Sequence, residues 1–381
     1  MSIEKRYVYA DNAATTKLDY DAFEAMKPYL LHEFGNASQP YSFSRSAKVA
    51  LKEARATIAE CIHAQPDEIF FTSGGTESDN WAIKACVASG EELITSSVEH
   101  HAVLNACSSM ERLGHSVFYI VPDHNAVVSP SKLKATLTEN TRIVSIMFAN
   151  NEIGTIEPIQ ELCHIAHQNG TLFHTDAVQA VGHVKINVKE LGVDLLSASA
   201  HKFHGPKGIG FLYIKKGTQM LPLLDGGRQE NGLRAGTENI ASIVGMATAL
   251  KNSCAVIEAT VRSISDLENA LLKKLYAMKL DFLHNGSAAD RLPGIISLSF
   301  PNVNGETLLH RMDLLGICVS TGSACNSGNE EISHVLKAIA VPKEYVKGTI
   351  RISLGKDNTI EDVDAIASAL YKILVKEKCI R

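Results

Sequence analysis

Residues 195–214 read Leu-Leu-Ser-Ala-Ser-Ala-His-Lys-Phe-His-Gly-Pro-Lys-Gly-Ile-Gly-Phe-Leu-Tyr-Ile. Two apolar runs in this stretch, Leu195–Ser199 and Ile209–Ile214, have the length of buried strands, and a Gly-Pro turn lies between them. The loop places Lys202 after the first strand, with a histidine on either side. A lysine in such a polar loop can form a Schiff base if its pKa is depressed, although most lysines are solvated surface residues. This segment alone leaves both interpretations open.

Similar short apolar runs precede this stretch along the chain, and helical patterns separate several of them. The expected strands are Ile69–Thr72, Leu93–Ser96, Val117–Val121, Ile143–Phe148, Thr171–Thr175, Leu195–Ser199 and Ile209–Ile214. The helical patterns include Thr76–Ala88, His101–Leu113 and Ile159–Gln168. Strands that alternate with helices favour a mostly parallel sheet covered on both faces, and such sheets bind ligands at the carboxyl ends of their strands. The sequence therefore predicts an α/β fold with a mostly parallel sheet of seven strands.

The pattern changes after about residue 255. A long helical segment is followed by two strands and a final helix, expected at Ser263–Lys279, Ile295–Phe300, Gly348–Leu354 and Ile360–Val375. This order is typical of a smaller α+β domain. We expect a large domain over residues 15–255 and a small domain made of residues 1–14 and 256–381, with the N-terminal segment packed against the C-terminal part.

Composition excludes several classes of function. The chain of 381 residues has a formal net charge of −5 and no long basic run, so nucleic acid is not an expected direct partner. No apolar stretch approaches the roughly 20 residues that span a bilayer, and the N-terminus lacks the apolar region of a signal peptide. We expect a cytoplasmic protein whose eight cysteines are mostly reduced.

Polar residues follow the predicted strand that ends in Phe173-His-Thr-Asp-Ala-Val-Gln179. A carboxylate at Asp176 could pair with a protonated pyridine nitrogen, and Gln179 would project nearby, toward a phenolic oxygen on the same ring. Asp176 could equally cap a following helix, and the two roles are compatible.

The segment Phe71-Thr-Ser-Gly-Gly-Thr-Glu-Ser-Asp-Asn80 runs from a strand through a Gly-Gly turn into a helix. Free N–H groups at a helix start bind anions, so Gly75 and Thr76 are candidate phosphate ligands.

Two further strand ends carry candidate residues. His100, at the start of a helix, could stack on an aromatic cofactor and transfer protons, although a lone histidine is more often structural. Two adjacent histidines do not face the same way on a helix, so we expect no metal site at His100 and His101. Asn151 follows another strand and could contact cofactor or substrate, or serve as a turn residue.

The ordered set of these motifs resembles the cysteine desulfurases, which are fold-type I pyridoxal phosphate enzymes related to the class-V aminotransferases. The resemblance rests on Thr72-Ser-Gly-Gly-Thr-Glu-Ser78, Glu99-His-His-Ala-Val103, Asn150-Asn-Glu-Ile-Gly154, His174-Thr-Asp-Ala-Val-Gln179, Ser199-Ala-His-Lys-Phe-His-Gly-Pro-Lys-Gly208, Arg228-Gln-Glu-Asn-Gly-Leu-Arg-Ala-Gly-Thr-Glu-Asn239, Ser320-Thr-Gly-Ser-Ala-Cys325 and Arg351-Ile-Ser-Leu-Gly355. Each motif is weak alone, but together they cover almost the whole chain.

The resemblance implies a role for each matching residue. Lys202 would hold pyridoxal 5'-phosphate as a Schiff base, Asp176 would pair with its pyridine nitrogen, Gln179 with its phenolic oxygen, and His100 would stack on its ring. The phosphate would be held by Gly75, Thr76, Ser199 and His201 of one chain and by Thr237 of a partner in a homodimer. Arg351 and Asn151 would hold the carboxylate of L-cysteine, and guanidinium suits that group because it binds carboxylate bidentately.

Cys325 is the expected nucleophile that takes the substrate sulfur as a persulfide while alanine leaves. A thiolate is a far better nucleophile than a thiol, and the small polar residues around Cys325 favour a flexible tether. The resemblance places residues 320–331 with the long, mobile loops of this family. Long-loop members pass sulfur to an acceptor protein, either an iron–sulfur scaffold or a thiolation enzyme, and Cys325 could transiently ligate a cluster on that partner. Without the resemblance, a surface cysteine in a loose loop would be the simpler interpretation.

The chain also departs from the family pattern. Tyr41 stands where relatives often carry a histidine, so substrate approach or loop docking is expected to differ. The tail after the last helix is short, which leaves the identity of the acceptor protein open. Two alternative functions share the cofactor: a selenocysteine lyase, which would strongly prefer selenium, and an aminotransferase, which would not need Cys325. A non-catalytic scaffold is disfavoured because the key positions are intact.

Overall fold

The computed structural model describes residues 7–321 and 332–376, and its main element is a sheet of seven strands in the order β2-β8-β7-β6-β5-β3-β4. The strands are β2 Ile69–Thr72, β3 Glu92–Ser96, β4 Val117–Ile120, β5 Thr141–Ser145, β6 Leu172–Asp176, β7 Leu195–Ser199 and β8 Gly210–Ile214. The run from β4 to β7 is parallel, whereas β8 is antiparallel to both β7 and β2. The predicted mostly parallel, seven-stranded α/β sheet is therefore confirmed.

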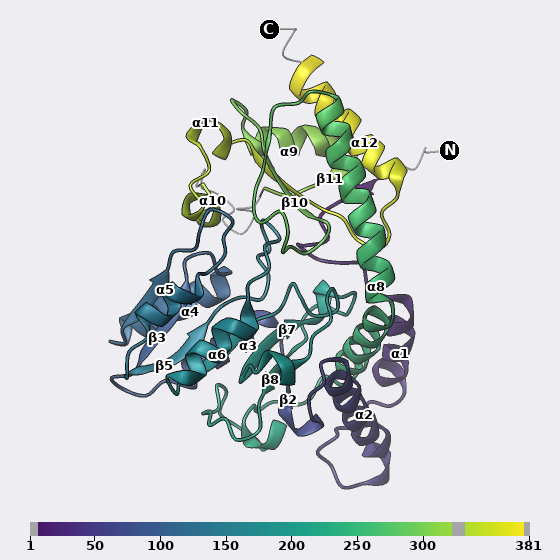
Figure 1. The fold of residues 1–381 in the computed structure, drawn as a ribbon. Helices are drawn as coiled ribbons and strands as arrows, with labels where there is room; N and C mark the ends of the chain where they lie inside the picture. The colour runs from purple at the N-terminus through teal and green to yellow at the C-terminus, as the bar shows by residue number, and fades with distance from the viewer. Residues whose placement is uncertain (1–6, 322–331, 377–381) are drawn as a thin grey trace.

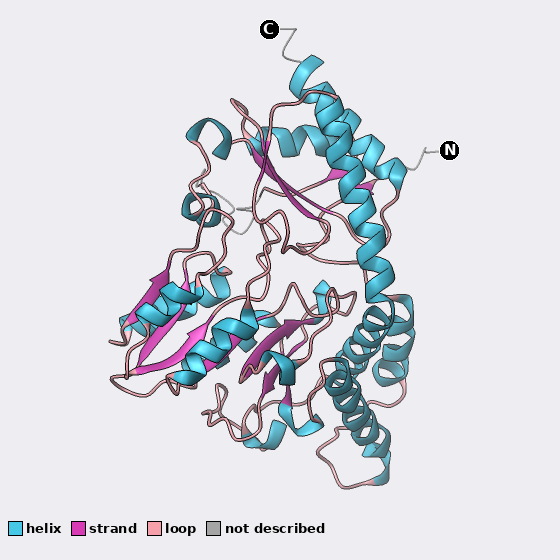
Figure 2. Cartoon of the chain, in the orientation of Figure 1, coloured by secondary structure: helices cyan, strands magenta, loops and turns pink. Residues whose placement is uncertain are grey.

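Helices cover both faces of this sheet (Figures 1 and 2). In chain order the helices are α1 Tyr20–Leu31, α2 Arg45–Cys61, α3 Gly75–Lys84, α4 His101–Arg112, α5 Pro130–Thr136, α6 Ile159–Gln168, α7 Val188–Leu191, α8 Ile240–Ala277, α9 Gly305–Leu314, α10 His334–Ala338, α11 Lys343–Val346 and α12 Ile360–Tyr371. Successive strand residues enter different cores: Leu195 packs with Trp81 of α3, and Leu196 packs with the cluster that includes α6 and α8. This alternation explains why the strands read as continuous apolar runs.

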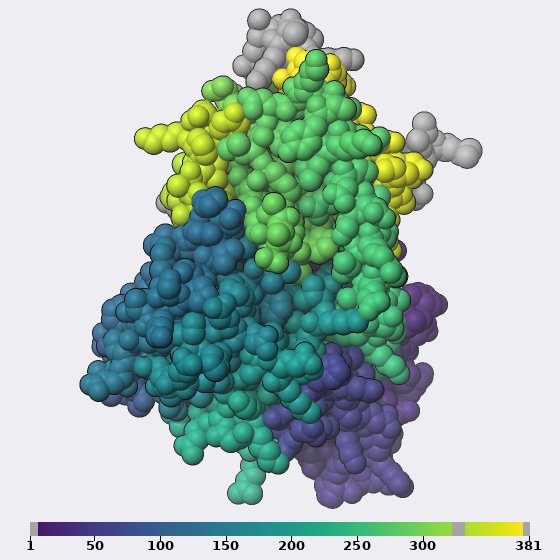
Figure 3. Space-filling model, viewed as in Figure 1, coloured from purple at the N-terminus to yellow at the C-terminus, as the bar shows by residue number. Residues whose placement is uncertain are grey.

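The C-terminal part contains a three-stranded sheet in the order β12-β10-β9. Its strands are β9 Leu283–His284, β10 Ile295–Ser299 and β12 Thr349–Ser353. β1 Val8–Tyr9 pairs in parallel with β11 Ile317–Cys318, and Val8 is buried in the core of the C-terminal part. The N-terminal strand thus lies beside β11 in the C-terminal part (Figure 1). Figure 3 shows the C-terminal part, in green and yellow, seated against the part built on the large sheet.

The largest difference from a predicted helix boundary is at the start of α8. The helix expected at Ser263–Lys279 begins at Ile240, so α8 runs unbroken across residue 255. Its first half carries small residues that allow close packing against α1 and α2, and these do not form a sharp amphipathic pattern. At Gly245, for example, an added Cβ would lie 2.6 Å from Sδ of Met26 on α1. The domain boundaries at residues 14 and 255 stay predictions, but a single helix joins the two parts.

Among the described residues, α8 is the helix long and apolar enough to cross a membrane by length and composition. Half of its most apolar window is buried inside the protein. Its first half packs on α1 and α2 and its second half on α12, so we interpret α8 as a core helix.

Candidate active site at the carboxyl ends of the strands

Lys202 lies in a single turn directly after β7, where the sequence places it. Its Nζ donates to the carbonyl oxygens of Ala13 and Ala14, at 2.5 and 3.0 Å. The carbonyl of Lys202 contacts Nε2 of His183 at 2.8 Å. The N-terminal segment, which is more than 180 residues away in sequence, therefore wraps the amine. The sequence analysis did not identify this segment, because Ala13 and Ala14 act through their backbone carbonyls and their side chains carry no functional group.

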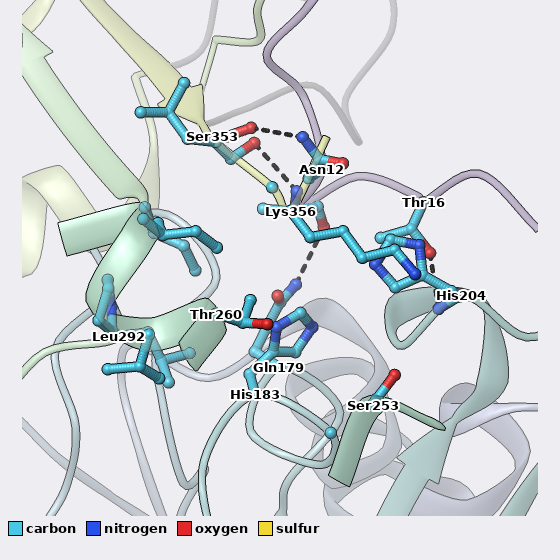
Figure 4. A pocket seen from close by; sticks show the side chains of 18 of the residues that line it. Asn12, Thr16, Gln179, His183, His204, Ser253, Thr260, Leu292, Ser353 and Lys356 are labelled. Carbon is cyan, nitrogen blue, oxygen red and sulfur yellow. Dashed lines mark hydrogen bonds between the residues drawn. The ribbon is translucent and has the colours of Figure 1, made fainter. Parts of the chain in front are cut away.

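The same segment supports the backbone around Lys202. Thr16 Oγ1 donates to the carbonyl of His201 at 2.9 Å and accepts from the N–H of His204 at 2.8 Å. Behind this turn lies a pocket at the junction with the C-terminal part (Figure 4). Gln179 and His183 line it from the large sheet, and Ser353 and Lys356 line it from the C-terminal part. The turn that carries Lys202 is thus held between the two parts of the chain.

Asp176 is the last residue of β6, the neighbour of β7, so it lies at the same sheet edge as Lys202. Burial raises the pKa of Asp176 to about 6, while the cation of Lys202 lowers it. Its Oδ1 accepts from the N–H of Val178 at 2.9 Å in a turn, and no helix starts there, so the capping role is wrong. Gln179 donates to the carbonyl of Ala13, the oxygen that Lys202 also contacts. The structure therefore brings these three predicted residues together.

A second buried layer lies beneath Asp176. Asp79 of α3 is almost fully buried, and burial together with the nearby Asp176 raises the pKa of its carboxyl well above the ordinary value. His174 bridges Ser145 and Ser197 through its two ring nitrogens, at 2.8 and 2.9 Å, and burial lowers its pKa to about 3. A neutral Asp79 and a neutral His174 leave Asp176 as the carboxylate that faces the Lys202 cation. Asp79 was within a quoted motif, but nothing in the sequence shows its burial.

His100 precedes α4 as its N-cap, and its Nδ1 accepts from the N–H of Ala102 at 3.1 Å. Burial lowers the pKa of His100 to about 4, with the charges of Lys202 and His101 acting in the same direction. The imidazole is therefore neutral at pH 7 and carries its proton on Nε2. His101 stacks toward His334 instead, with ring centroids 4.8 Å apart. Within residues 7–321 and 332–376, no group of three or more His, Cys, Asp or Glu side chains could hold a metal ion.

The Gly-Gly turn forms an anion cradle at the start of α3, a helix of ten residues. Gly74 has φ +149°, which disfavours a side chain, and a Cβ on Gly75 would lie 2.5 Å from Cγ2 of Val178. The surrounding pocket is lined by the predicted Gly75, Thr76, Ser199 and His201 and also by Ala14, Thr15, Ser73, Gly74, Glu77, Lys207 and Gly208. Backbone N–H groups at a helix start and the cation of Lys207 suit a phosphate. Lys207 was missed as a site residue because a lysine after Gly-Pro has no distinguishing pattern.

Of the residues predicted to bind the phosphate, His201 lines the cradle and Thr237 does not. His201 lines the cradle, where its Nδ1 contacts Thr15 Oγ1 at 3.2 Å and burial lowers its pKa to about 4. Thr237 is exposed and does not line the cradle of its own chain. Its loop is nonetheless tied to the cradle helix, because Arg234 pairs with Glu77 at 2.8 Å.

Arg351 on β12 is 5% exposed and approaches the site from the C-terminal part. Its Nη1 donates to the carbonyl of Asn151 and its Nη2 to Asp11 Oδ1, both at 2.9 Å. Its Nε is buried and has no hydrogen-bond partner among the described residues. Asn151 and Arg351 are thus in contact, and Asn151 contributes its backbone oxygen. A guanidinium suits a small carboxylate because its donors form a planar fork.

Cys325 lies outside the described residues, but both ends of its segment are anchored beside the site. On the N-terminal side, Ser320 pairs with Arg351 as an antiparallel bridge. On the C-terminal side, Ser333 Oγ donates to Glu152 at 2.6 Å and His334 Nε2 contacts the carbonyl of Glu99 at 2.9 Å. Glu152 and Glu99 directly precede or follow the site residues Asn151 and His100 in the chain.

Comparison with known proteins identifies the class to which this fold and site belong. The family model for class-V aminotransferases matches residues 8–366, so the chain is a member of that family, whose enzymes use pyridoxal phosphate. A solved structure titled NIFS-like protein superposes with a TM-score of 0.91 at 37% identity and covers 97% of this chain and 99% of its own. Another, titled SspA in complex with cysteine, has a TM-score of 0.83 at 34% identity over 92% of this chain and 100% of its own.

Curated relatives define the group within the class. A cysteine desulfurase IscS from Dictyoglomus turgidum is 50% identical over 99% of this chain and 96% of its own length. A cysteine desulfurase IscS from Methanosarcina thermophila is 47% identical over 99% of this chain and 94% of its own. The chain therefore belongs to the cysteine desulfurases, and the resemblance seen in its motifs is confirmed.

Proposed function

We propose that the protein is a cysteine desulfurase that converts L-cysteine to L-alanine and carries the released sulfur as a persulfide on Cys325. One observation supports this most directly. Residues 11–14 touch both ends of a substrate site, because Asp11 binds Arg351 and the carbonyls of Ala13 and Ala14 bind Lys202. One short segment thereby contacts both Arg351, which would bind the carboxylate of an α-amino acid, and the reactive amine of Lys202.

The residues of the site fit pyridoxal 5'-phosphate. Lys202 would hold it covalently, Asp176 would face its pyridine nitrogen, Gln179 its phenolic oxygen, and the Gly75–Thr76 cradle with Ser199 and His201 its phosphate. The carboxylate of Asp176 suits a pyridinium because its buried neighbours Asp79 and His174 are neutral. The Gly75–Thr76 cradle suits a phosphate because backbone N–H groups line it. When bound, the cofactor supplies an electron sink for charge drawn from the substrate.

The chain's own residues divide the remaining tasks. Arg351 binds the substrate carboxylate through its guanidinium and orients the α-carbon. The amine of Lys202, once free, accepts the α-proton. His100 would stack on the cofactor ring, and its neutral imidazole would donate a hydrogen bond from Nε2–H to the substrate sulfur and mediate proton transfer there. The Cys325 thiolate attacks that sulfur, so that an S–S bond forms as the Cβ–S bond breaks and its electron pair returns to the carbon side.

The reach of the chain is compatible with this attack. Cys325 is four positions after Thr321, the last described residue before residues 322–331, so an extended segment spans at most about 14 Å. Because Ser320 pairs with Arg351, the thiol can reach the substrate carboxylate site without any change in the sheet. From there the same tether would deliver sulfur to an acceptor protein, either an iron–sulfur scaffold or a thiolation enzyme, in the cytoplasm.

The proposal includes a homodimer in which Thr237 completes the phosphate site of the partner. Large apolar side chains are exposed around α1 and the start of α2, namely Tyr20, Phe23, Leu30, Leu31, Phe34, Tyr41, Phe43 and Val49. Exposed patches of this kind are typical of protein interfaces. Tyr41, the departure from the family pattern, belongs to this set, and its effect on substrate approach or loop docking stays a prediction.

Mixed dimers test the shared site. Lys202→Ala and Thr237→Ala homodimers should both be impaired, but a mixed dimer holds one site with an intact Lys202 and an intact Thr237 from the other chain. Co-refolded or co-expressed chains should therefore recover activity. Failure to recover would show that Thr237 acts within its own chain, and an unimpaired Thr237→Ala homodimer would show that it has no role.

The activity itself is tested by alanine release from L-cysteine with a reductant present. Cys325→Ala should abolish turnover and prevent trapping of a persulfide by an alkylating reagent, whereas Cys107→Ala, which changes a buried thiol on α4, should retain both. Preferred turnover of L-selenocysteine would indicate the lyase instead. Transfer of the amino group to a keto acid, with Cys325→Ala fully active, would indicate an aminotransferase.

A further inference from the structure

Two thiols outside the active site meet between α2 and α8. Cys61 is the last residue of α2, and Cys254 lies in the first half of α8. Both are free and partly exposed, and both line one surface pocket together with His63, Lys185 and Lys251. The pocket opens to solvent on a side of the molecule lined by none of the predicted site residues. Both cysteines therefore lie at a surface pocket that is open to solvent.

The two thiols hydrogen-bond each other, and this contact makes them chemically unequal. The contact raises the pKa of the Cys61 thiol and lowers the pKa of the Cys254 thiol. Lys251, one helical turn before Cys254, places positive charge beside the pair and lowers the pKa of Cys61 against that trend. A thiol with a lowered pKa and a second thiol in contact is the arrangement of a dithiol that oxidises to a disulfide.

Three buried cysteines differ from this pair in the pKa of their thiols. Cys86, Cys107 and Cys163 are buried, and burial raises the pKa of each thiol to about 12. Such thiols stay protonated at neutral pH and are shielded from reagents in solution. The pair at Cys61 and Cys254 therefore stands apart from these three, which serve as core residues.

We propose that Cys61 and Cys254 form a peroxide-reactive dithiol, a modification site separate from the desulfurase site. The Cys254 thiolate attacks one oxygen of a hydroperoxide, the O–O bond breaks, and Cys254 becomes a sulfenic acid as water or an alcohol leaves. Cys61 then attacks the Cys254 sulfur, the S–O bond breaks, water leaves, and the disulfide forms. Two thiols are oxidised, one hydroperoxide is reduced by the same two electrons, and both thiol protons end on the leaving oxygens.

The reaction has a structural consequence. The two sulfur atoms must come to a bonded distance of about 2.05 Å. The resulting bond joins the end of α2 to the helix that continues into the C-terminal part (Figure 1). Because the link closes a very long loop of chain, it should stabilise the folded state, and the thermal midpoint should rise.

Peptide mapping of the full-length protein tests the proposal. A Cys325→Ser background removes the competing loop thiol. After treatment with one equivalent of hydrogen peroxide, two thiols per chain should be lost, and digestion without reductant should yield a linked peptide containing Cys61 and Cys254. Dithiothreitol should restore both thiols. Cys107→Ala in the same background is the matched control and should give the same linked peptide.

Single substitutions separate the two roles. Cys61→Ser should leave Cys254 as a sulfenic acid that dimedone labels, whereas Cys254→Ser should slow peroxide consumption at least tenfold. Three results would overturn the proposal: thiol loss with no linked peptide, a disulfide between two chains on a non-reducing gel in place of the internal one, or loss of two thiols in Cys61→Ser. Because alanine production is not the readout, failure here would leave the desulfurase proposal untouched.

Discussion

Ser320 and Arg351 exchange both backbone hydrogen bonds across an antiparallel bridge, with N–O distances of 3.0 and 2.6 Å. This bridge attaches the start of the segment that carries Cys325 to the arginine proposed to hold the substrate carboxylate. The arginine is in turn bound to Asp11 and to the backbone of Asn151. The sulfur-accepting thiol is therefore tethered at the site where the substrate would be oriented.

Arg351→Lys should weaken cysteine binding while preserving the positive charge. Lysine cannot donate from a planar fork, so it cannot serve Asn151, Asp11 and a carboxylate at once. Loss of a hydrogen bond to a charged group costs about 1.5–3 kcal/mol, so KM for cysteine should rise by roughly tenfold or more. Steady-state kinetics of alanine release measure this KM. Arg291→Lys is the matched control, because Arg291 pairs with Glu268 at 3.3 Å within the C-terminal part, and it should affect stability without raising KM.

Gly75→Ala should weaken cofactor binding because its new Cβ would lie 2.5 Å from Cγ2 of Val178. The clash should push the start of α3 away from the cradle, and the affinity for pyridoxal phosphate should fall about tenfold or more. Reconstitution of the apoprotein, followed by visible absorbance, measures the affinity. Val178→Ala alone should bind nearly normally, and the double variant should regain much of the lost affinity. A double variant as weak as Gly75→Ala would contradict the steric explanation.

His100→Asn separates catalysis from helix capping. Asparagine is a favourable N-cap residue, so the contact that His100 makes with the N–H of Ala102 should be replaced and the unfolding free energy retained. The imidazole proton donor and its aromatic face are lost, so kcat should fall about 100-fold or more. His100→Ala should lose kcat and also about 1 kcal/mol of stability. Unchanged kcat in His100→Asn would restrict His100 to the structural role.

Glu157 should make stability depend on pH. It is 4% exposed, accepts from the N–H of Val128, and burial raises its pKa from 4.5 to about 8. Between pH 4.5 and about 8, the Glu157 carboxyl is protonated in the folded state and ionised in the unfolded chain. The free energy of unfolding should therefore fall as pH rises from 4.5 to about 8, by at most about 1.4 kcal/mol per pH unit from this group.

Urea unfolding at pH 5.5 and 7.5 checks this sign. Glu157→Gln can no longer release a proton, so its stability should change less over this range than that of the unmodified protein. Glu161→Gln, an exposed position on α6, is the matched control and should follow the unmodified protein. Equal slopes in Glu157→Gln and the unmodified protein would contradict a raised pKa at Glu157.

Much of the fold follows from local pattern. The runs around Phe70 and Leu195 are strands because each residue packs into one of two cores, and such runs read as continuous apolar sequence. The strand ends then place Asp176 and Lys202 side by side, since β6 and β7 are neighbours in the parallel sheet. These features depend on residues close together in sequence, which explains why they could be predicted.

Other features depend on contacts between distant segments. The start of α8 at Ile240 depends on its packing against α1 and α2, and its small residues carry no strong helical period. The role of Ala13, whose carbonyl binds both Lys202 and Gln179, depends on where the N-terminal segment folds back. A backbone carbonyl has no signature in a sequence.

The sequence by itself determined the order of strands and helices along the chain and the residues at the strand ends. Its motifs also determined the family. Only the tertiary structure decided that Asp79 is buried beneath Asp176, that residues 11–14 join Arg351 to Lys202, and that Cys61 meets Cys254. The physical reason is the range of the interactions. Hydrophobic period and turn chemistry act over a few residues, whereas burial, charge pairing and thiol contact depend on which remote segments share the same space.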